Sequence, residues 1–314
     1  MKQIDLFKPK SIEINPVFAR HETFHPRFGW FKKGYDKIVQ DPGIFAKETA
    51  PTVLGVGKNM VKAIKYWCIA FKIIEEEKIK GKKSLFFPSV IASKLLADEG
   101  WDPYLENPAS LWLLHWQLFR TPCDAPVWFF VFNQFNKYEF TFGDLLAQSR
   151  ELKDQIFPSK KTTDSSLSKD INCLLRMYVK RNGSKKLKED SLDCPFTELG
   201  IISEIGGSKK FTFNFGDKSN LKPEIVVAAC LDFASLMDTS AKTISISRLL
   251  YDAGSPGSIF KLNEGSLCEA IEQVSIKNKK IALTDSAGLI QLAFSEDPSL
   301  LSESILNNYY KKGI

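Results

Sequence analysis

The stretch that decides the fold is "LGVGKNMVKAIKYW" (residues 54–67), in which a glycine-rich turn leads into an amphipathic helix. Its apolar side chains recur at intervals of three and four residues and share one helical face, while lysines occupy another. Upstream, residues 27–40 predict a first helix and residues 44–53 a short second one. Two helices, a glycine turn and a basic helix together predict a helix-turn-helix motif.

The segment that follows, "EEEKIKGKKSLFFPS" (residues 75–89), predicts the wing of a winged helix. Residues 78–80 and 83–87 are expected to form two short strands around Gly81. Eight lysines but only three glutamates fall between positions 58 and 83, which concentrates positive charge on this motif. A basic stripe of this kind indicates binding to a polyanion. Its coincidence with a helix-turn-helix favours DNA over an ordinary solvated surface.

The bulk composition is that of an ordinary globular protein. With 314 residues, of which 44% are hydrophobic and 25% charged, the chain is long enough for two or three domains. No apolar run approaches the roughly 18 residues of a membrane span, and no signal-peptide pattern is present, so we expect a cytoplasmic protein without membrane contact. The six cysteines form no CxxC pair, which argues against a disulfide framework or a zinc site.

These patterns predict a mainly α fold with small β-hairpins (α+β). An N-terminal winged helix-turn-helix would be joined to a helical C-terminal domain. In that domain "TISISRLL" (243–250) and "NEGSLCEAIEQV" (263–274) indicate a second helix-turn-helix-like unit. No internal repeat is visible, and His115 is expected to pack in the core. We predict a winged-helix DNA-binding domain at 1–100, a helical connecting region at 101–157, a polar linker at 158–170 and a C-terminal helical domain at 171–314.

Familiar catalytic motifs are absent from the sequence: there is no P-loop, GxGxxG, HExxH or GxSxG. We therefore expect no nucleotide or organic cofactor. The stretch "HETFHPRFGW" (residues 21–30) holds two of the three histidines of the chain, together with a glutamate and an arginine. There, His21, Glu22 and Arg27 could place a general base and a phosphate clamp beside a DNA backbone.

The alternative is that residues 21–30 are an ordinary start to the first helix. His21 or Thr23 would then cap that helix, and Arg27, Lys32 and Lys33 would anchor phosphates or remain solvated. The residue types alone leave both interpretations open.

Five separated blocks of the sequence resemble a known family. They are "HETFHPRFGWFKKGYD", "LGVGKNMVKAIKYW", "DPYLENPASLWLLHW", "CPFTELGI" and "SPGSIFKLNE". The blocks are collinear from about residue 18 to residue 292 and resemble the bacterial domain-of-unknown-function family 4007. Members of that family occur beside a cysteine desulfurase, an ATP-pyrophosphatase resembling PAPS reductase, and an ATPase in DNA phosphorothioation systems.

The resemblance implies a protein that finds its target on double-stranded DNA and nicks or primes the strand for sulfur insertion in a phage-defence system. Side chains of the basic helix would face the major groove, where Asn59 could read adenine, and other lysines would hold phosphates. The implied DNA-binding residues are Lys32, Lys33, Lys58, Asn59, Lys62, Lys65, Lys78, Lys80, Lys82 and Lys83.

If the family nicks DNA, the resemblance assigns the chemistry to His21 as base or acid, Glu22 as metal ligand or orienting partner, and Arg27 on the phosphate, with Asp102 and Tyr104 behind them. A nickase would use Mg²⁺ or Mn²⁺ to stabilise the leaving oxygen. The implied partners are the pyrophosphatase, the desulfurase and the ATPase, and a homodimer is one alternative state. The competing functions are a non-catalytic DNA-targeting scaffold and a transcriptional regulator of the same operon.

Overall fold

The computed structural model describes residues 12–78, 80–81, 83–135, 137–180, 194–237 and 242–311. These residues fold into two compact units. The N-terminal unit comprises residues 15–119 and 124–214, and the C-terminal unit comprises residues 12–14, 120–123 and 215–311. The domain limits expected from the sequence stay predictions, although a helix already begins at Asp164, inside the stretch expected to be a linker.

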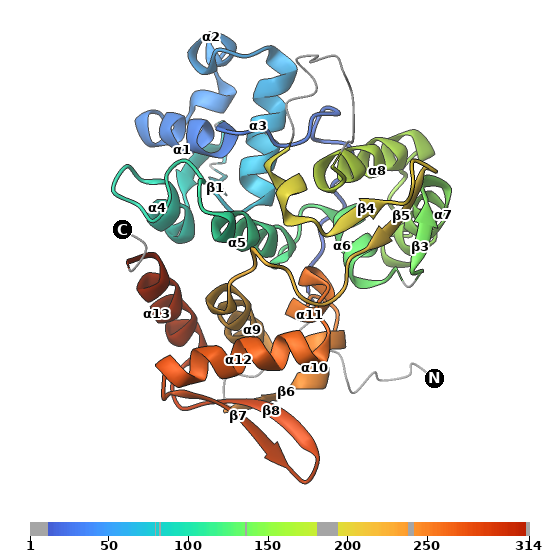
Figure 1. The fold of residues 1–314 in the computed structure, drawn as a ribbon. Helices are drawn as coiled ribbons and strands as arrows, with labels where there is room; N and C mark the ends of the chain where they lie inside the picture. Colours follow the sequence, from blue (N-terminus) through green and yellow to red (C-terminus); the bar gives the residue numbers. More distant parts are fainter. Residues whose placement is uncertain are drawn as a thin grey trace. The chain divides into compact units, whose positions relative to one another are not determined.

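The first module of the N-terminal unit is a winged helix-turn-helix, as expected (Figure 1). Gly55 adopts a left-handed conformation with φ 65° and ends the second helix, which turns the chain into the third. Gly34 lies where the first and third helices pack, because a Cβ there would be only 2.4 Å from the Cys68 sulfur. The elements are α1 (Trp30–Gln40), η1 (Ile44–Ala46), α2 (Ala50–Leu54), α3 (Lys58–Ala70), β1 (Ile74–Glu77), β2 (Leu85–Pro88) and α4 (Val90–Leu96).

The two strands of the wing lie closer to the helices, in the chain, than the sequence predicted. The paired strands are β1 and β2, in a register that opposes Ile74 to Pro88, and not residues 78–80 and 83–87. Ile74 and Phe86 are buried and fix the hairpin against the module, so the lysines fall in the connection between the strands. Lys82 lies outside the described residues.

A second module completes the N-terminal unit. Its three short strands pair antiparallel in the order β3-β5-β4, so the strand before the helices lies beside the last strand of the hairpin. That connection is the one found in a winged helix. The elements are α5 (Pro108–Phe119), α6 (Pro126–Asn133), β3 (Glu139–Thr141), α7 (Phe142–Ile156), α8 (Asp164–Tyr178), η3 (Pro195–Leu199), β4 (Ile202–Glu204) and β5 (Lys210–Phe213).

Helices α5 and α6 form the centre of the N-terminal unit. Every residue of α5 from Ala109 to Phe119 is buried. His115 is among them, and its Nδ1 lies 2.8 Å from the hydroxyl of Tyr178 on α8, which confirms that this histidine is packed in the core. Helix α7 begins with a capping box, in which the Thr141 hydroxyl and the Asp144 carboxylate exchange hydrogen bonds with each other's backbone amides.

The C-terminal unit contains a third module of the same kind. The predicted helix-turn-helix-like unit is confirmed, and it carries its own wing, because the strand order β6-β8-β7 repeats that of the second module. Its elements are α9 (Pro223–Met237), β6 (Thr243–Ser245), α10 (Ile246–Tyr251), α11 (Pro256–Phe260), α12 (Glu264–Lys277), β7 (Ile281–Ser286), β8 (Leu289–Phe294) and α13 (Pro298–Lys311).

The predicted fold class is therefore confirmed: the protein is mainly α-helical with small antiparallel β-structures. The sequence shows no repeat, but the three modules share one order of elements. In each of them a pair of helices comes before a β-hairpin. All six cysteines are free thiols. Within the described ranges, no helix is long and apolar enough to cross a bilayer.

Candidate nucleic-acid interface

Helix α3 exposes a basic face at its N-terminal end. Val61, Ile64 and Trp67 are buried, and this leaves Lys58, Asn59 and Lys62 exposed to solvent. No acidic residue occupies the first turn of α3, so the positive end of the helix dipole adds to the charge of the lysines. The face thus combines cationic side chains with an amide that can pair with a base edge.

Lys65 continues this face but is partly buried. Its ammonium lies 4.5 Å from the centroid of the Phe86 ring on β2, a cation–π contact that links the helix to the wing. Lys65 therefore contributes positive charge at the junction of α3 and the wing.

The wing lysines have unequal surroundings. Lys78, Lys80 and Lys83 are exposed, and the Lys83 ammonium donates a hydrogen bond of 2.9 Å to the Ala46 carbonyl. The glutamates at positions 75–77 on β1 are exposed as well and offset part of the positive charge of the wing. The first turn of α3, by contrast, contains no acidic residue.

Two lysines that were expected to hold DNA phosphates instead form hydrogen bonds within the protein. Lys32 is only 8% exposed, and its ammonium donates hydrogen bonds of 2.7 Å to both Asp36 and Asp98, which neutralise it. Lys33 donates to the Leu54 carbonyl at 3.0 Å and satisfies the C-terminal end of α2. Both ammonium groups are therefore less accessible to a phosphate than that of the exposed Lys58.

His21 is completely buried in the N-terminal unit. Its Nε2 lies 2.8 Å from the Asp170 carboxylate on α8, and its ring stacks on Trp67 of α3 at 5.9 Å between centroids. Trp128 of α6 meets the same ring edge-on. Burial raises the pKa of Asp170, while the hydrogen bond from His21 opposes that shift. This position makes His21 the joint between three helices and keeps it from direct contact with a DNA backbone.

Glu22 and Arg27 have different partners from His21. The Glu22 carboxylate lies 3.4 Å from the Lys62 ammonium, at the edge of the basic face of α3. The Arg27 guanidinium lies 5.7 Å from the Phe24 ring centroid and 5.6 Å from that of Trp30, held by cation–π contacts. Only Glu22 is thereby placed against a predicted DNA-binding residue.

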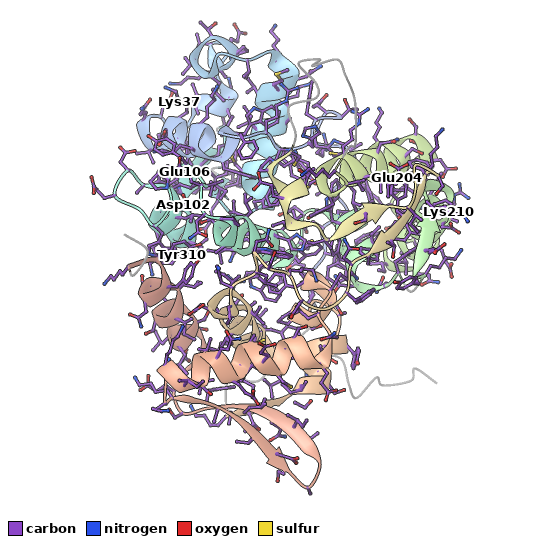
Figure 2. All side chains as sticks on the ribbon, in the orientation of Figure 1. Lys37, Asp102, Glu106, Glu204, Lys210 and Tyr310 are labelled. Carbon is purple, nitrogen blue, oxygen red and sulfur yellow. The ribbon has the colours of Figure 1, made fainter. Side chains whose placement is uncertain are left out.

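Asp102 and Tyr104 lie between α4 and α5. The buried Asp102 carboxylate accepts hydrogen bonds from the backbone amides of Glu106 and Asn107, just before α5 begins, so its role is structural (Figure 2). Tyr104 is 70% exposed and lines a pocket of about 370 Å³ together with Lys33 and Lys37 of α1.

The residues present do not form a recognisable metal centre. Nowhere in the described ranges do three or more histidine, cysteine, aspartate or glutamate side chains gather closely enough to bind a metal ion. Beside the basic face, the Glu22 carboxylate is paired with a lysine ammonium, which opposes binding of a cation.

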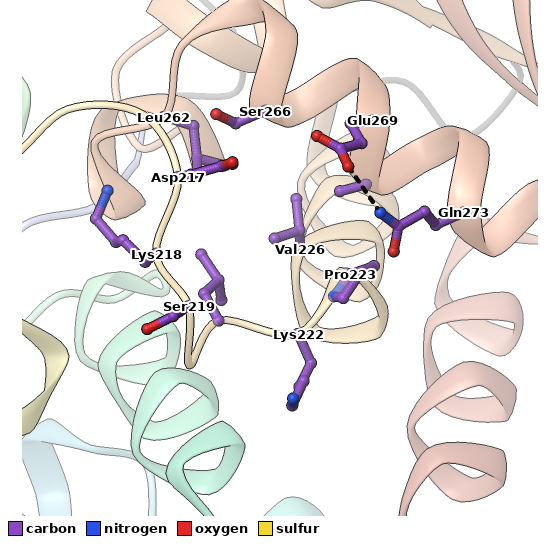
Figure 3. Close-up of a pocket in the computed structure, with 12 residues that line it drawn as sticks. Asp217, Lys218, Ser219, Lys222, Pro223, Val226, Leu262, Ser266, Glu269 and Gln273 are labelled. Carbon is purple, nitrogen blue, oxygen red and sulfur yellow. Dashed lines mark hydrogen bonds between the residues drawn. The ribbon is translucent and has the colours of Figure 1, made fainter.

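Sequence reasoning missed a lysine-lined pocket in the C-terminal unit, shown in Figure 3. Its volume is about 250 Å³, and its walls include Lys218, Lys222, Glu269 and Gln273. Burial lowers the pKa of Lys218 to about 8, and it lowers the pKa of neighbouring Lys261 to about 7. Lysines are normally surface residues, so no pattern in the sequence signals this burial.

The chain thus contains three modules with winged-helix connectivity, and the third helix of the first module has an exposed basic face. The chain is a member of the family described as "Protein of unknown function (DUF4007)", whose pattern it matches over residues 18–310. This confirms the resemblance seen in the sequence.

Two solved structures are similar to this protein along nearly its whole length. One, described as "SspB crystal structure", is 36% identical with a TM-score of 0.90 and covers 96% of this chain and 89% of its own. The other, described as "Magnesium ion-bound SspB crystal structure", has the same identity and TM-score and covers 95% and 89%. No curated protein matches the sequence.

Proposed function

We propose that this protein is the double-stranded DNA-binding component of a DNA phosphorothioation and phage-defence system. The observation that carries the proposal is the exposed face of α3, where Lys58, Asn59 and Lys62 stand on the third helix of a winged helix-turn-helix. Family membership and the likeness to SspB support the assignment to phosphorothioation.

In this proposal the N-terminal end of α3 enters the major groove. Lys58 and Lys62 contact phosphates, while Asn59 reaches a base edge, where its amide can pair with N6 and N7 of adenine. The wing lysines contact the backbone beside the groove. Because most of the binding energy would come from released counterions, affinity falls steeply as salt rises.

Strand nicking is the second candidate activity, and the observation that favours it is a similar SspB structure described as bound to magnesium. Glu22 is the proposed participant nearest the basic face, and Arg27 would hold a phosphate. Since His21 is buried, its part in nicking would be to position Trp67 and α3 rather than to transfer a proton.

In this proposal the other proteins of the phosphorothioation system are the partners of this protein. We propose that the protein acts in the cytoplasm and presents DNA to a PAPS-reductase-like ATP-pyrophosphatase, which works with a cysteine desulfurase and an ATPase. A non-catalytic scaffold would bind DNA without cutting it. A transcriptional regulator would instead form a symmetric dimer on a palindromic site.

A plasmid assay separates these functions. Purified protein is incubated with supercoiled plasmid in Mg²⁺, Mn²⁺ or EDTA, and a gel shift is run on the same DNA. Nicking predicts metal-dependent open circles that are lost in Glu22→Gln but retained in the control Glu99→Gln, which changes an exposed glutamate on another loop. Binding without open circles would leave the protein as a DNA-targeting subunit, and absence of binding would contradict the proposal.

A further inference from the structure

The second module presents a helix in the same topological position as α3. Helix α8 is the last α-helix before the hairpin of β4 and β5, as α3 is before β1 and β2. In a winged helix this is the helix whose outer face enters a groove. The chemistry of the exposed side chains of α8 therefore decides whether the second module can also bind DNA.

The outer face of α8 is polar and basic. Lys169, Asn172 and Arg176 are exposed at spacings of three and four residues, so they form one stripe along the helix. The opposite face is buried through Ile171, Leu174 and other apolar side chains. Lys180, just beyond the end of the helix, is exposed as well.

The acidic residue at the start of α8 does not cancel this charge. Arg150 on α7 binds the Asp164 carboxylate with both Nε and Nη2, at 2.9 and 2.6 Å. In the structure as described, no ion pair neutralises Lys169 or Arg176. The stripe thus resembles that of α3, where an amide also lies between two basic side chains.

The wing of the second module is also basic. Lys209 and Lys210 are exposed on the β5 side of the hairpin. Glu204, at the end of β4, is paired with Phe211, the residue after Lys210 (Figure 2). The Glu204 carboxylate accepts a hydrogen bond of 3.1 Å from the backbone amide of Lys209, so it stabilises the turn. Both ammonium groups remain available at the tip of the wing.

The third module has the opposite character. The outer face of α12 exposes Glu264, Glu269 and Glu272, and its one exposed lysine, Lys277, is paired with Glu224 at 3.2 Å. Such a face repels phosphates. The second and third modules therefore have the same order of elements but differ in charge. The exposed cations of α8 have no counterpart on α12.

We infer that α8 and the wing of β4 and β5 form a second surface that contacts double-stranded DNA. This inference rests on the proposed function of α3. Both helices belong to the N-terminal unit and meet at His21, which bonds to Asp170 of α8 and stacks on Trp67 of α3. The buried joint holds the two surfaces at a fixed spacing, so the protein contacts a longer stretch of duplex than one winged helix covers.

The test combines salt titration with footprinting on the full-length protein. Binding to a labelled DNA duplex is measured by fluorescence anisotropy at several salt concentrations for wild type, Lys209→Gln/Lys210→Gln and Lys58→Gln/Lys62→Gln. The control is Lys277→Gln/Lys279→Gln, which removes the same charge from exposed positions of the third module. Circular dichroism checks that each variant is folded.

We expect the Lys209/Lys210 variant to reduce the slope of log affinity against log salt by about two, since each lost phosphate contact removes about 0.9. Hydroxyl-radical footprinting should show that one protected stretch is lost while another persists. An unchanged slope and footprint for this variant, with weakened binding in Lys58→Gln/Lys62→Gln, would overturn the second surface but leave the proposed function intact. Absence of DNA binding by wild type would overturn both.

Discussion

The His21 imidazole lies 2.8 Å from the Asp170 carboxylate, although 149 residues separate them in the chain. The pair is fully buried, and its histidine ring stacks on Trp67. A hydrogen bond thus joins the segment before α1 to helix α8, and the aromatic contact joins it to α3. The histidine that stands out in the sequence as a candidate base is a structural joint between the first and second modules.

Loss of this joint should destabilise the N-terminal unit. His21→Ala removes the histidine from the buried Asp170 carboxylate, which keeps only its hydrogen bonds from the Ala19 backbone amide among those described. Breaking a buried pair of this kind costs about 3–5 kcal/mol. Urea unfolding followed by tryptophan fluorescence measures the change. The matched control is His25→Ala, which alters a partly exposed histidine four residues away. Equal losses from the two variants would refute the structural role of His21.

The contact between α1 and α3 depends on the absence of a side chain at Gly34. Gly34→Ala would place a Cβ 2.4 Å from the Cys68 sulfur, and overpacking of this kind costs about 1–3 kcal/mol. Adding Cys68→Ala should restore part of the free energy of unfolding, because it removes the clashing atom. Gly43→Ala, whose Cβ would lie no closer than 3.6 Å to Asp41, serves as control. A stable single variant with no effect of the second change would contradict this packing.

The buried Lys261 should make the stability of the C-terminal unit depend on pH. Burial lowers its pKa from 10.5 to about 7, so between these values the unfolded chain binds more protons than the folded one. The free energy of unfolding therefore rises with pH from about 7 to about 10.5. Each pKa unit corresponds to about 1.4 kcal/mol.

Lys261→Met tests this dependence through thermal unfolding at several pH values. The gain in Tm over wild type should be largest at pH 6, where the buried lysine is protonated, and should shrink towards pH 10. Lys279→Met changes an exposed lysine and should leave the profile unchanged. A gain that does not vary with pH would show that Lys261 titrates normally.

Local patterns in the sequence were sufficient to predict the first module. The apolar spacing of α3 and the turn at Gly55 are both contained within about twenty residues, and the structure has them as expected. The strands of the wing lie at other residues than predicted, because the burial of Ile74 and Phe86, rather than the positions of the lysines, determines which residues pair. Turn signals marked the hairpin but could not set its register.

Contacts between residues that lie far apart in the chain could not be predicted from local sequence patterns. The second module depends on pairing between β3 and β5, strands of three and four residues that lie about seventy positions apart. The ion pair of Lys32 with Asp36 follows helical spacing, but its bond to Asp98 does not. The burial of His21 likewise requires a partner on a distant helix, so residue type alone suggested a catalytic group.

The central claim is that the outer face of α3 binds double-stranded DNA, and the salt dependence of binding tests it most directly. Fluorescence anisotropy with a labelled duplex would compare wild type with Lys58→Gln/Lys62→Gln, using Lys277→Gln/Lys279→Gln as the charge-matched control. We expect the α3 variant to bind more weakly and to lower the slope of log affinity against log salt by about two, with no change in the control. Equal affinity and slope for wild type and the α3 variant would contradict the account.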